Sequence, residues 1–204
     1  MSTSNRKFKA AVLVSGGGST ALNLIECAAR GEIPVDITLV ISHRSDIPAM
    51  TRCAGAGRTV EVISGIPSSH ASDQLDERLR AHGIELILLA GYLRPLRVGP
   101  WLGRALNIHP ALLPEFGGRG MFGRHVHVAV LAARARESGC TVHLVDDRYD
   151  HGEILVQRRV AVIPTDDPLS LAKRVFEQEC IAYPEAIRIW ATRMERSLLG
   201  SCAY

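Results

Sequence analysis

Ala10-Ala11-Val12-Leu13-Val14 runs directly into Ser15-Gly16-Gly17-Gly18-Ser19, and this stretch decides the fold class. Its first half is apolar without alternation, which is typical of a strand buried on both faces of a parallel sheet. The glycines allow a tight turn, and apolar residues then recur with helical spacing from residue 21 to residue 29. A strand, a glycine-rich turn and a helix in this order indicate a doubly wound α/β sheet.

The same succession of elements continues along the chain. Further strands are expected at residues 37–41, 60–63, 86–90 and 105–109, with helices at 47–56, 72–82 and 127–136. Residues 141–145 and 154–162 are expected to add strands at a mixed edge. A long helix should run from Pro168 towards Arg193, with a kink or a break at Tyr183-Pro184.

These elements predict a single α/β domain with a doubly wound, mostly parallel sheet. We expect the folded domain to cover residues 9–195. Residues 1–8 would form a flexible N-terminal tail, and residues 196–204 a C-terminal tail.

Composition places the chain among ordinary globular proteins. Of its 204 residues, 47% are hydrophobic and 22% are charged, which suits one domain with a proper core. The net charge of +3 gives no reason to expect a nucleic-acid partner. The cysteines are scattered without metal-ligand spacing, which indicates reduced thiols and no metal site. With no signal peptide and no membrane-spanning run in view, we expect a cytoplasmic monomer or homodimer acting on small molecules, without a membrane partner.

The glycine-rich turn is the first candidate for ligand binding. A helix N-terminus after such a turn offers free amides and a positive dipole end to a phosphate. The spacing is not that of a dinucleotide fingerprint, because Thr20 and Ala21 stand where its last glycine would fall. No acidic residue ends the second strand, and no Gly-Lys-Ser/Thr follows the loop. The sequence therefore favours a phosphomonoester, and the alternative is a tight turn with a Ser N-cap.

The second candidate is Asn107-Ile108-His109-Pro110, which Pro114 follows. On an extended segment the side chains of Asn107 and His109 point to the same side. The prolines end regular structure just beyond them. An amide can donate to a developing oxyanion, and an imidazole can move a proton near neutral pH. The alternative is a satisfied asparagine and a buried or capping histidine at a strand end.

The third candidate is a polar loop, Asp146-Asp147-Arg148-Tyr149-Asp150-His151-Gly152, between two expected strands. A carboxylate delivered there can orient an imidazole, hold a water molecule or accept a proton. The alternative is a solvated turn, for which Asp and Gly are favoured residues.

Together these segments resemble the glycinamide ribonucleotide formyltransferases, the folate-dependent transformylases of purine synthesis. The resemblance runs from about Lys9 to Arg193. An Asn-x-His-Pro-Ser/Ala-Leu-Leu-Pro segment with a downstream Asp-x-Gly is specific to formyl-transferring folate enzymes, and it implies their Rossmann-like fold. The markers are residues 14–19, 89–94, 107–114 and 139–143, Asp150-x-Gly152, Gln178-Glu179 and Tyr183-Pro184.

The resemblance implies a reaction and roles at its centre. A formyl group would pass from 10-formyltetrahydrofolate, the co-substrate, to the primary amine of glycinamide ribonucleotide, without a metal. Asn107 and protonated His109 would stabilise the oxyanion, and His109 would help move a proton to the departing folate nitrogen. Asp150 would orient His109 and a water molecule that relays the proton from the amine.

The resemblance also implies two binding regions. Gly17, Gly18 and Ser19-Thr20-Ala21 would hold the ribose phosphate, and Glu179 corresponds to the family's ligand for the acceptor nucleotide. Two loops would line the folate pocket with Leu93, Arg94, Pro95, Leu96, Asp146, Asp147, Arg148 and Tyr149. Leu93 and Leu96 are equally compatible with core positions.

Three positions depart from the family pattern. Ser19-Thr20-Ala21 stands where the family usually has Ser-Asn-Leu, and Cys180 stands where it usually has a histidine. Ser72 stands where some members have an arginine that contacts the folate tail. None of the three lies at the presumed chemical centre.

Two other classes of function remain open on the sequence. One is another use of the same residues: hydrolysis of 10-formyltetrahydrofolate, or formyl transfer to methionyl-tRNA or an amino sugar. The other is a nucleotide-binding module without catalysis. The enzyme hypothesis predicts that His109→Ala or Asp150→Asn lowers turnover by orders of magnitude while the protein stays folded, whereas a binding module would keep its ligand.

Overall fold

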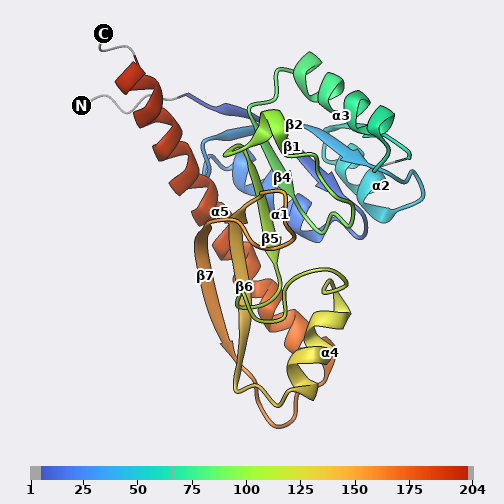
Figure 1. Ribbon diagram of the computed structural model, residues 1–204, viewed down its shortest axis with the longest axis vertical. Coiled ribbons are helices and arrows are strands. Elements are labelled where there is room, and N and C mark those ends of the chain that lie inside the picture. Colours follow the sequence, from blue (N-terminus) through green and yellow to red (C-terminus); the bar gives the residue numbers. More distant parts are fainter. Residues whose placement is uncertain (1–5, 66, 202–204) are drawn as a thin grey trace.

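The computed structural model describes residues 6–65 and 67–201 (Figure 1). Its strands are β1 (Phe8–Val14), β2 (Val35–Ser42), β3 (Thr59–Val62), β4 (Leu86–Leu89), β5 (Ala105–His109), β6 (Glu137–Leu144) and β7 (Ile154–Ala161). Its helices are α1 (Ser19–Ala29), α2 (Pro48–Gly55), α3 (Ser69–Ala81), α4 (Arg124–Ala132) and α5 (Pro168–Ser201), with a short 3-10 helix at Gly99–Trp101.

The strands form one seven-stranded sheet in the order β3-β2-β1-β4-β5-β6-β7. Neighbours from β3 to β5 are parallel, whereas β6 and β7 pair antiparallel. This arrangement confirms the predicted doubly wound, mostly parallel sheet with a mixed edge. The strand order reverses between β1 and β4, and ligands of such sheets bind outside the carboxyl ends of the strands at that point.

The sheet is covered on both faces, which explains why residues 10–14 of β1 are apolar without alternation. On β1, Ala10, Val12 and Val14 join the core cluster that includes α1, α2, α4 and α5. Ala11 and Leu13, which point the other way, join a second cluster that includes α3. All five side chains are fully buried, so both faces of β1 are apolar over these residues, and the polar Lys9, near the start of the strand, is exposed.

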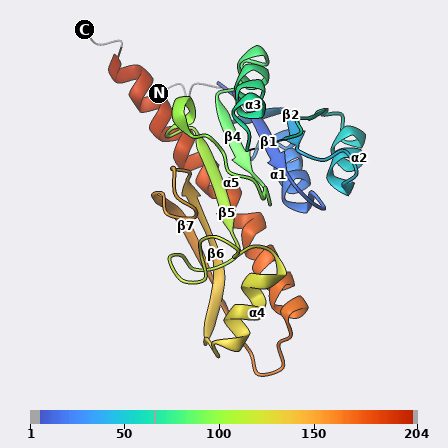
Figure 2. The ribbon, with the colours of Figure 1, turned by 45° about the vertical axis from the view of Figure 1, so that its right-hand side comes forward.

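Helix α5 passes through Pro184 without ending, so of the expected kink or break at Tyr183-Pro184 the break is wrong. It runs along the length of the molecule in both views (Figures 1 and 2). Proline lacks the N–H that would bond the carbonyl of Cys180, four residues earlier. Asn23 of α1 supplies that donor, with Nδ2 3.3 Å from the Cys180 oxygen. Tyr183 is fully buried, and the carbonyl oxygens of Leu89 and Leu106 share the one hydrogen of its hydroxyl, at 3.1 Å and 3.0 Å, so tertiary contacts hold the helix there.

Helix α4 lies earlier in the chain than the expected 127–136, because it begins at Arg124 and ends at Ala132. Arg134 adopts a left-handed φ of 52°, a conformation that stops a right-handed helix. Helical spacing of apolar residues continued past this point in the sequence and gave no sign of the stop.

The ends of the domain differ from the expected 9–195. Residues 1–5 of the predicted N-terminal tail lie outside the described residues, and Phe8 belongs to β1, where its ring meets Trp190 edge-on at 5.1 Å. At the other end α5 continues to Ser201, through residues assigned to a C-terminal tail. Glu195, Arg196 and Leu198 are good helix formers, which favours this extension. Residues 202–204 lie outside the described residues.

None of the helices within residues 6–65 and 67–201 is long and apolar enough to cross a membrane.

Candidate active site

A cavity of about 630 Å³ opens at the carboxyl ends of β4 and β5, at the point where the strand order reverses. Its walls come from the loop after β4, the end of β5, residues 118–123 and the loop between β6 and β7. Thr20 of α1, His127 of α4, His143 of β6 and Glu179 of α5 also line it. The fold therefore brings the separate candidate segments of the sequence to one place.

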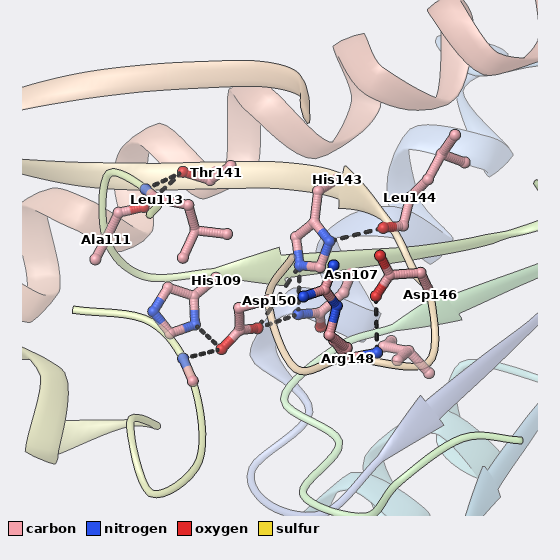
Figure 3. A network of polar contacts seen from close by, with 12 residues as sticks. Asn107, His109, Ala111, Leu113, Thr141, His143, Leu144, Asp146, Arg148 and Asp150 are labelled. Atoms are coloured by element: carbon pink, nitrogen blue, oxygen red, sulfur yellow. Dashed lines mark hydrogen bonds and ion pairs between the residues drawn. The ribbon is translucent and has the colours of Figure 1, made fainter. Parts of the chain in front are cut away.

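Asn107, His109 and Asp150 meet at this cavity (Figure 3). His109 Nδ1 lies 3.5 Å from Asp150 Oδ2, and Asn107 Nδ2 donates to Asp150 Oδ1 at 3.3 Å. The backbone N–H of Gly118 donates to Asp150 Oδ2 at 2.9 Å. The loop that carries Asp150 is thus not a solvated turn at this residue, because its carboxylate is largely buried and joins both polar side chains of β5.

The environment of His109 determines where its protons lie. The ring is 3% exposed, and Nε2 lies 2.8 Å from the carbonyl oxygen of Phe116. A carbonyl oxygen only accepts, so Nε2 carries a proton and Nδ1 faces Asp150. Burial lowers the pKa of His109 below its ordinary value, although the charge of Asp150 and the Phe116 carbonyl both act to raise it. The ring can therefore gain a second proton at Nδ1, beside the carboxylate, and this prepares it to give up the proton on Nε2.

Asp150 is held as a carboxylate. Burial acts to raise its pKa, but the polar groups around the carboxylate, among them His109 and the N–H of Gly118, outweigh burial and hold the pKa below its ordinary value. Its backbone has a left-handed φ of 52°. A charged group in this position stabilises the protonated form of His109.

His143 is a buried member of the same cluster for which the sequence predicted no role. It lies on β6 directly opposite Asn107 of β5, in the antiparallel pairing that also sets Thr141 opposite His109. Its Nε2 lies 3.1 Å from Asn107 Nδ2 and 3.7 Å from Asp150 Oδ1, and its Nδ1 lies 2.8 Å from the carbonyl oxygen of Leu144. The strand segment at residues 139–143 was a marker of the family resemblance, and its alternation is the signal that could have found this residue.

The glycine-rich turn forms the N-terminus of α1. Gly18 is the N-cap with φ 77°, so the alternative of a Ser N-cap is wrong, and Ser19 is the first helical residue. The amides of Ser19, Thr20 and Ala21 occupy the first turn, where N–H groups have no intrahelical acceptor. Of the predicted phosphate ligands, only Thr20 lines the cavity, whereas Gly17, Gly18 and Ser19 lie outside its lining. The side chain of Ala21 is fully buried, which leaves only its amide for a ligand.

Both loops predicted to bind folate line the cavity. Leu93-Arg94-Pro95-Leu96 forms one wall and Asp146-Asp147-Arg148-Tyr149 another. Leu93 is 48% exposed, so the alternative of a core position does not hold for it. Leu96 is partly buried against the second core cluster and still reaches the cavity.

Glu179 faces the cavity from α5, together with Ala172 and Phe176, which the sequence did not single out. Burial raises the pKa of its carboxyl group to about 7. Among the described residues no group of three or more His, Cys, Asp or Glu side chains could hold a metal ion.

A family model described as formyl transferase matches residues 8–187. The chain belongs to the formyl transferase family. Membership confirms the resemblance found in the sequence and agrees with the placement of Asn107, His109 and Asp150 at one cavity.

Individual members of the formyl transferase family are similar over most of the chain. The phosphoribosylglycinamide formyltransferase of Haemophilus influenzae is 33% identical over 202 residues, which cover 96% of this chain and 92% of that protein. The chloroplastic enzyme of Arabidopsis thaliana is 41% identical over 189 residues, but this chain spans only 65% of its length. A crystal structure of glycinamide ribonucleotide transformylase 1 from Symbiobacterium toebii matches with a TM-score of 0.85 and 34% identity, covering 93% of this chain and 90% of that one.

Proposed function

We propose that this formyl transferase moves the formyl group of 10-formyltetrahydrofolate to the amine of glycinamide ribonucleotide, a step of purine biosynthesis. The observation that carries the proposal is the convergence of Asn107, His109 and Asp150 at a cavity with a glycine-capped helix nearby and two further loops along its wall. Relatives that bear the name of this enzyme, including the Haemophilus influenzae protein that this chain spans almost fully, support the choice of substrates.

The arrangement suits attack of an amine on a formyl carbon. The attack gives a tetrahedral intermediate whose oxygen becomes an oxyanion, and preorganised donors stabilise that charge. Asn107 Nδ2 has one hydrogen directed at Asp150 Oδ1 through a long contact of 3.3 Å. Exchange of this weak bond for a bond to the oxyanion makes the stabilisation specific to the transition state.

His109 and Asp150 then take part in the two proton transfers of the reaction. The collapsing intermediate releases tetrahydrofolate, whose nitrogen takes the Nε2 proton of doubly protonated His109. The attacking amine loses a proton to water held by Asp150, and this water passes the proton on to His109, which regains the proton that it gave up. In the structure Nε2 of His109 donates to the Phe116 carbonyl, so the folate nitrogen has to take the place of that oxygen. The Asp150 carboxylate keeps a charged imidazole favourable at the moment it is needed.

The two ends of the cavity are proposed to hold the substrates. The free amides of the first turn of α1 suit the phosphate of the acceptor, and Glu179 suits its hydroxyl or amino groups. The loops at residues 93–96 and 146–149 suit the pterin ring, with polar backbone edges and the apolar side chains of Leu93 and Leu96. Cytoplasmic location and a monomeric or dimeric state stay predictions.

One assay tests the function. Purified protein is incubated with 10-formyltetrahydrofolate, with and without glycinamide ribonucleotide, and release of tetrahydrofolate is followed. Transfer predicts release that depends on the acceptor, with a formylated nucleotide formed in equal amount. Release without acceptor would instead show a hydrolase. The Asp150→Asn and His109→Ala variants are expected to lose at least about 100-fold in kcat while remaining folded, whereas a binding module would bind its ligand unchanged.

A further inference from the structure

His143 contacts two of the proposed catalytic residues but has no role in the reaction as described above. Its ring is 2% exposed, so both of its nitrogens need partners within the protein. Nδ1 lies 2.8 Å from the carbonyl oxygen of Leu144, which only accepts, so Nδ1 carries a proton. In the neutral imidazole Nε2 is then a hydrogen-bond acceptor. Figure 3 shows the His143 ring between Leu144 and Asn107.

An acceptor at Nε2 decides which end of the Asn107 amide can face it. Asn107 Nδ2 lies 3.1 Å from this nitrogen and donates one hydrogen to it. The other hydrogen of Nδ2 is directed at Asp150 Oδ1. If the amide turned over, its oxygen would face two acceptors, so the pair of contacts selects one orientation of the amide.

We propose that His143 is a positioning residue that fixes the orientation of the Asn107 amide. The chain of hydrogen bonds runs from the Leu144 carbonyl through the imidazole of His143 to Asn107 Nδ2. Because one hydrogen of Nδ2 stays on His143, the second keeps its direction and can pass from Asp150 to the oxyanion. Without His143 the amide can present its oxygen, which would repel that charge. The effect on turnover rests on the proposed function, whereas the hydrogen-bond chain does not.

Two substitutions separate this role from simple filling of space. His143→Gln places an amide oxygen near the position of Nε2, where it can accept from Asn107, whereas His143→Met fills a similar volume without an accepting oxygen or nitrogen. We expect His143→Gln to stay within about fivefold of the wild-type kcat and His143→Met to lose about 10- to 100-fold, less than loss of the donor itself. KM for both substrates should stay within about threefold, because the proposed role of His143 is to orient Asn107 for the transition state and not to bind either substrate.

The matched control is Ser138→Ala. Ser138 is also buried and polar on β6, and its hydroxyl has no hydrogen-bond partner within the described part of the chain. Its removal should leave kcat and the melting temperature close to wild type. The proposal would be overturned if His143→Gln and His143→Met lose kcat equally and both also have a lower melting temperature. Such a result would show a structural role for His143.

A double-mutant comparison tests whether His143 acts through Asn107. In an Asn107→Ala background, His143→Met should lower kcat by less than about twofold, because the amide that it positions is already gone. A second loss as large as that in the wild type would show an independent effect and overturn the proposal.

Nitrogen-15 NMR of the His143 imidazole shows which of its nitrogens is protonated, and it requires neither the folate nor the nucleotide substrate. The wild-type protein at neutral pH should show His143 protonated at Nδ1 and unprotonated at Nε2. A proton on Nε2 would overturn the hydrogen-bond chain. Because this measurement uses the wild-type protein, it holds even if the variants fail to fold. If NMR shows the expected tautomer but the activity assay detects no formyl transfer, the proposed function is wrong, whereas the positioning of Asn107 by His143 stays supported.

Discussion

A Cβ atom placed on Gly152 would lie 1.9 Å from the carbonyl oxygen of Leu144. The same oxygen accepts the hydrogen bond from His143 Nδ1. The loop that carries Asp150 therefore returns to the end of β6 so closely that residue 152 has no room for a side chain. This contact gives a physical reason for a glycine two residues after the carboxylate.

Gly152→Ala adds only one methyl group, but we expect it to lower both the activity and the stability of the protein. The added methyl group meets backbone on β6, which no change of rotamer can relieve, so the loop with Asp150 has to move. A displacement of about 1 Å at a catalytic group can cost about 100-fold in rate. We expect kcat to fall by about this factor and the free energy of unfolding to fall by about 1–3 kcal/mol, measured by steady-state kinetics and urea unfolding.

Gly55→Ala is the control for this substitution. Gly55 ends α2, and a Cβ placed there would meet nothing within 4 Å. It should keep wild-type kcat and unfold at the same urea concentration or a slightly higher one. Wild-type activity in Gly152→Ala would show that the loop is not held in the way described.

Asn23 is expected to stabilise the proline-containing turn of α5. It donates to the carbonyl of Cys180, which the missing N–H of Pro184 leaves without its helical partner. Asn23→Ala should lower the free energy of unfolding by about 1–2 kcal/mol, measured by urea denaturation. In a Pro184→Ala background the helix supplies its own N–H, so the same substitution should cost much less. Equal cost in both backgrounds would contradict this compensation.

The contrast between β1 and α5 shows which features of the fold are readable from the sequence. The apolar run at residues 10–14 and the glycines after it lie next to each other, so local pattern was sufficient to predict a buried strand, a turn and a helix. The continuity of α5 depends on Asn23, which lies 157 positions from its partner Cys180. No local pattern contains that contact, and Pro184 alone argued for a break.

The same distinction holds in the site. Asn107 and His109 are two residues apart on one strand, so their common direction follows from strand geometry. The role of His143 depends on the register that sets it opposite Asn107, which only the pairing of β5 with β6 determines. Glu179 was found through the family resemblance, and its burial became visible only in the fold.

Gly18→Ala is expected to weaken binding of the acceptor more than it slows the reaction. Gly18 has φ 77°, and a Cβ there would lie 2.7 Å from the Cβ of Ala49 on α2. The first turn of α1, whose amides are proposed to bind the phosphate, has to shift. We expect about tenfold higher KM for glycinamide ribonucleotide, unchanged KM for the folate, and about 1–3 kcal/mol lower stability.

Gly16→Ala is the matched variant in the same turn. A Cβ on Gly16 meets nothing within 4 Å, and this glycine is not among those with positive φ. Its KM for both substrates should match the wild type. An unchanged KM in Gly18→Ala, with the expected loss of stability, would place the phosphate elsewhere.

Glu179 is expected to make stability depend on pH in the direction opposite to most carboxylates. Burial raises the pKa of its carboxyl from 4.5 to about 7 in the folded protein. Between these values the folded protein holds a proton that the unfolded chain has released, so the free energy of unfolding falls as pH rises from 4.5 to 7. Glu179→Gln removes this titration, and its stability relative to wild type should grow over that window and then level off.

Urea unfolding at pH 5 and pH 8 measures the difference, with Glu177→Gln as the exposed control on the same helix. The control should show no such divergence from wild type between the two pH values. If the free energies of unfolding of Glu179→Gln and wild type differ by the same amount at both pH values, the carboxyl is already ionised in the folded protein, and a positive charge near it would have to offset its burial.

A Glu179 carboxyl that is neutral near pH 7 but able to ionise suits contact with an amine that must lose its proton before it attacks. The pair can share that proton without a large free-energy cost.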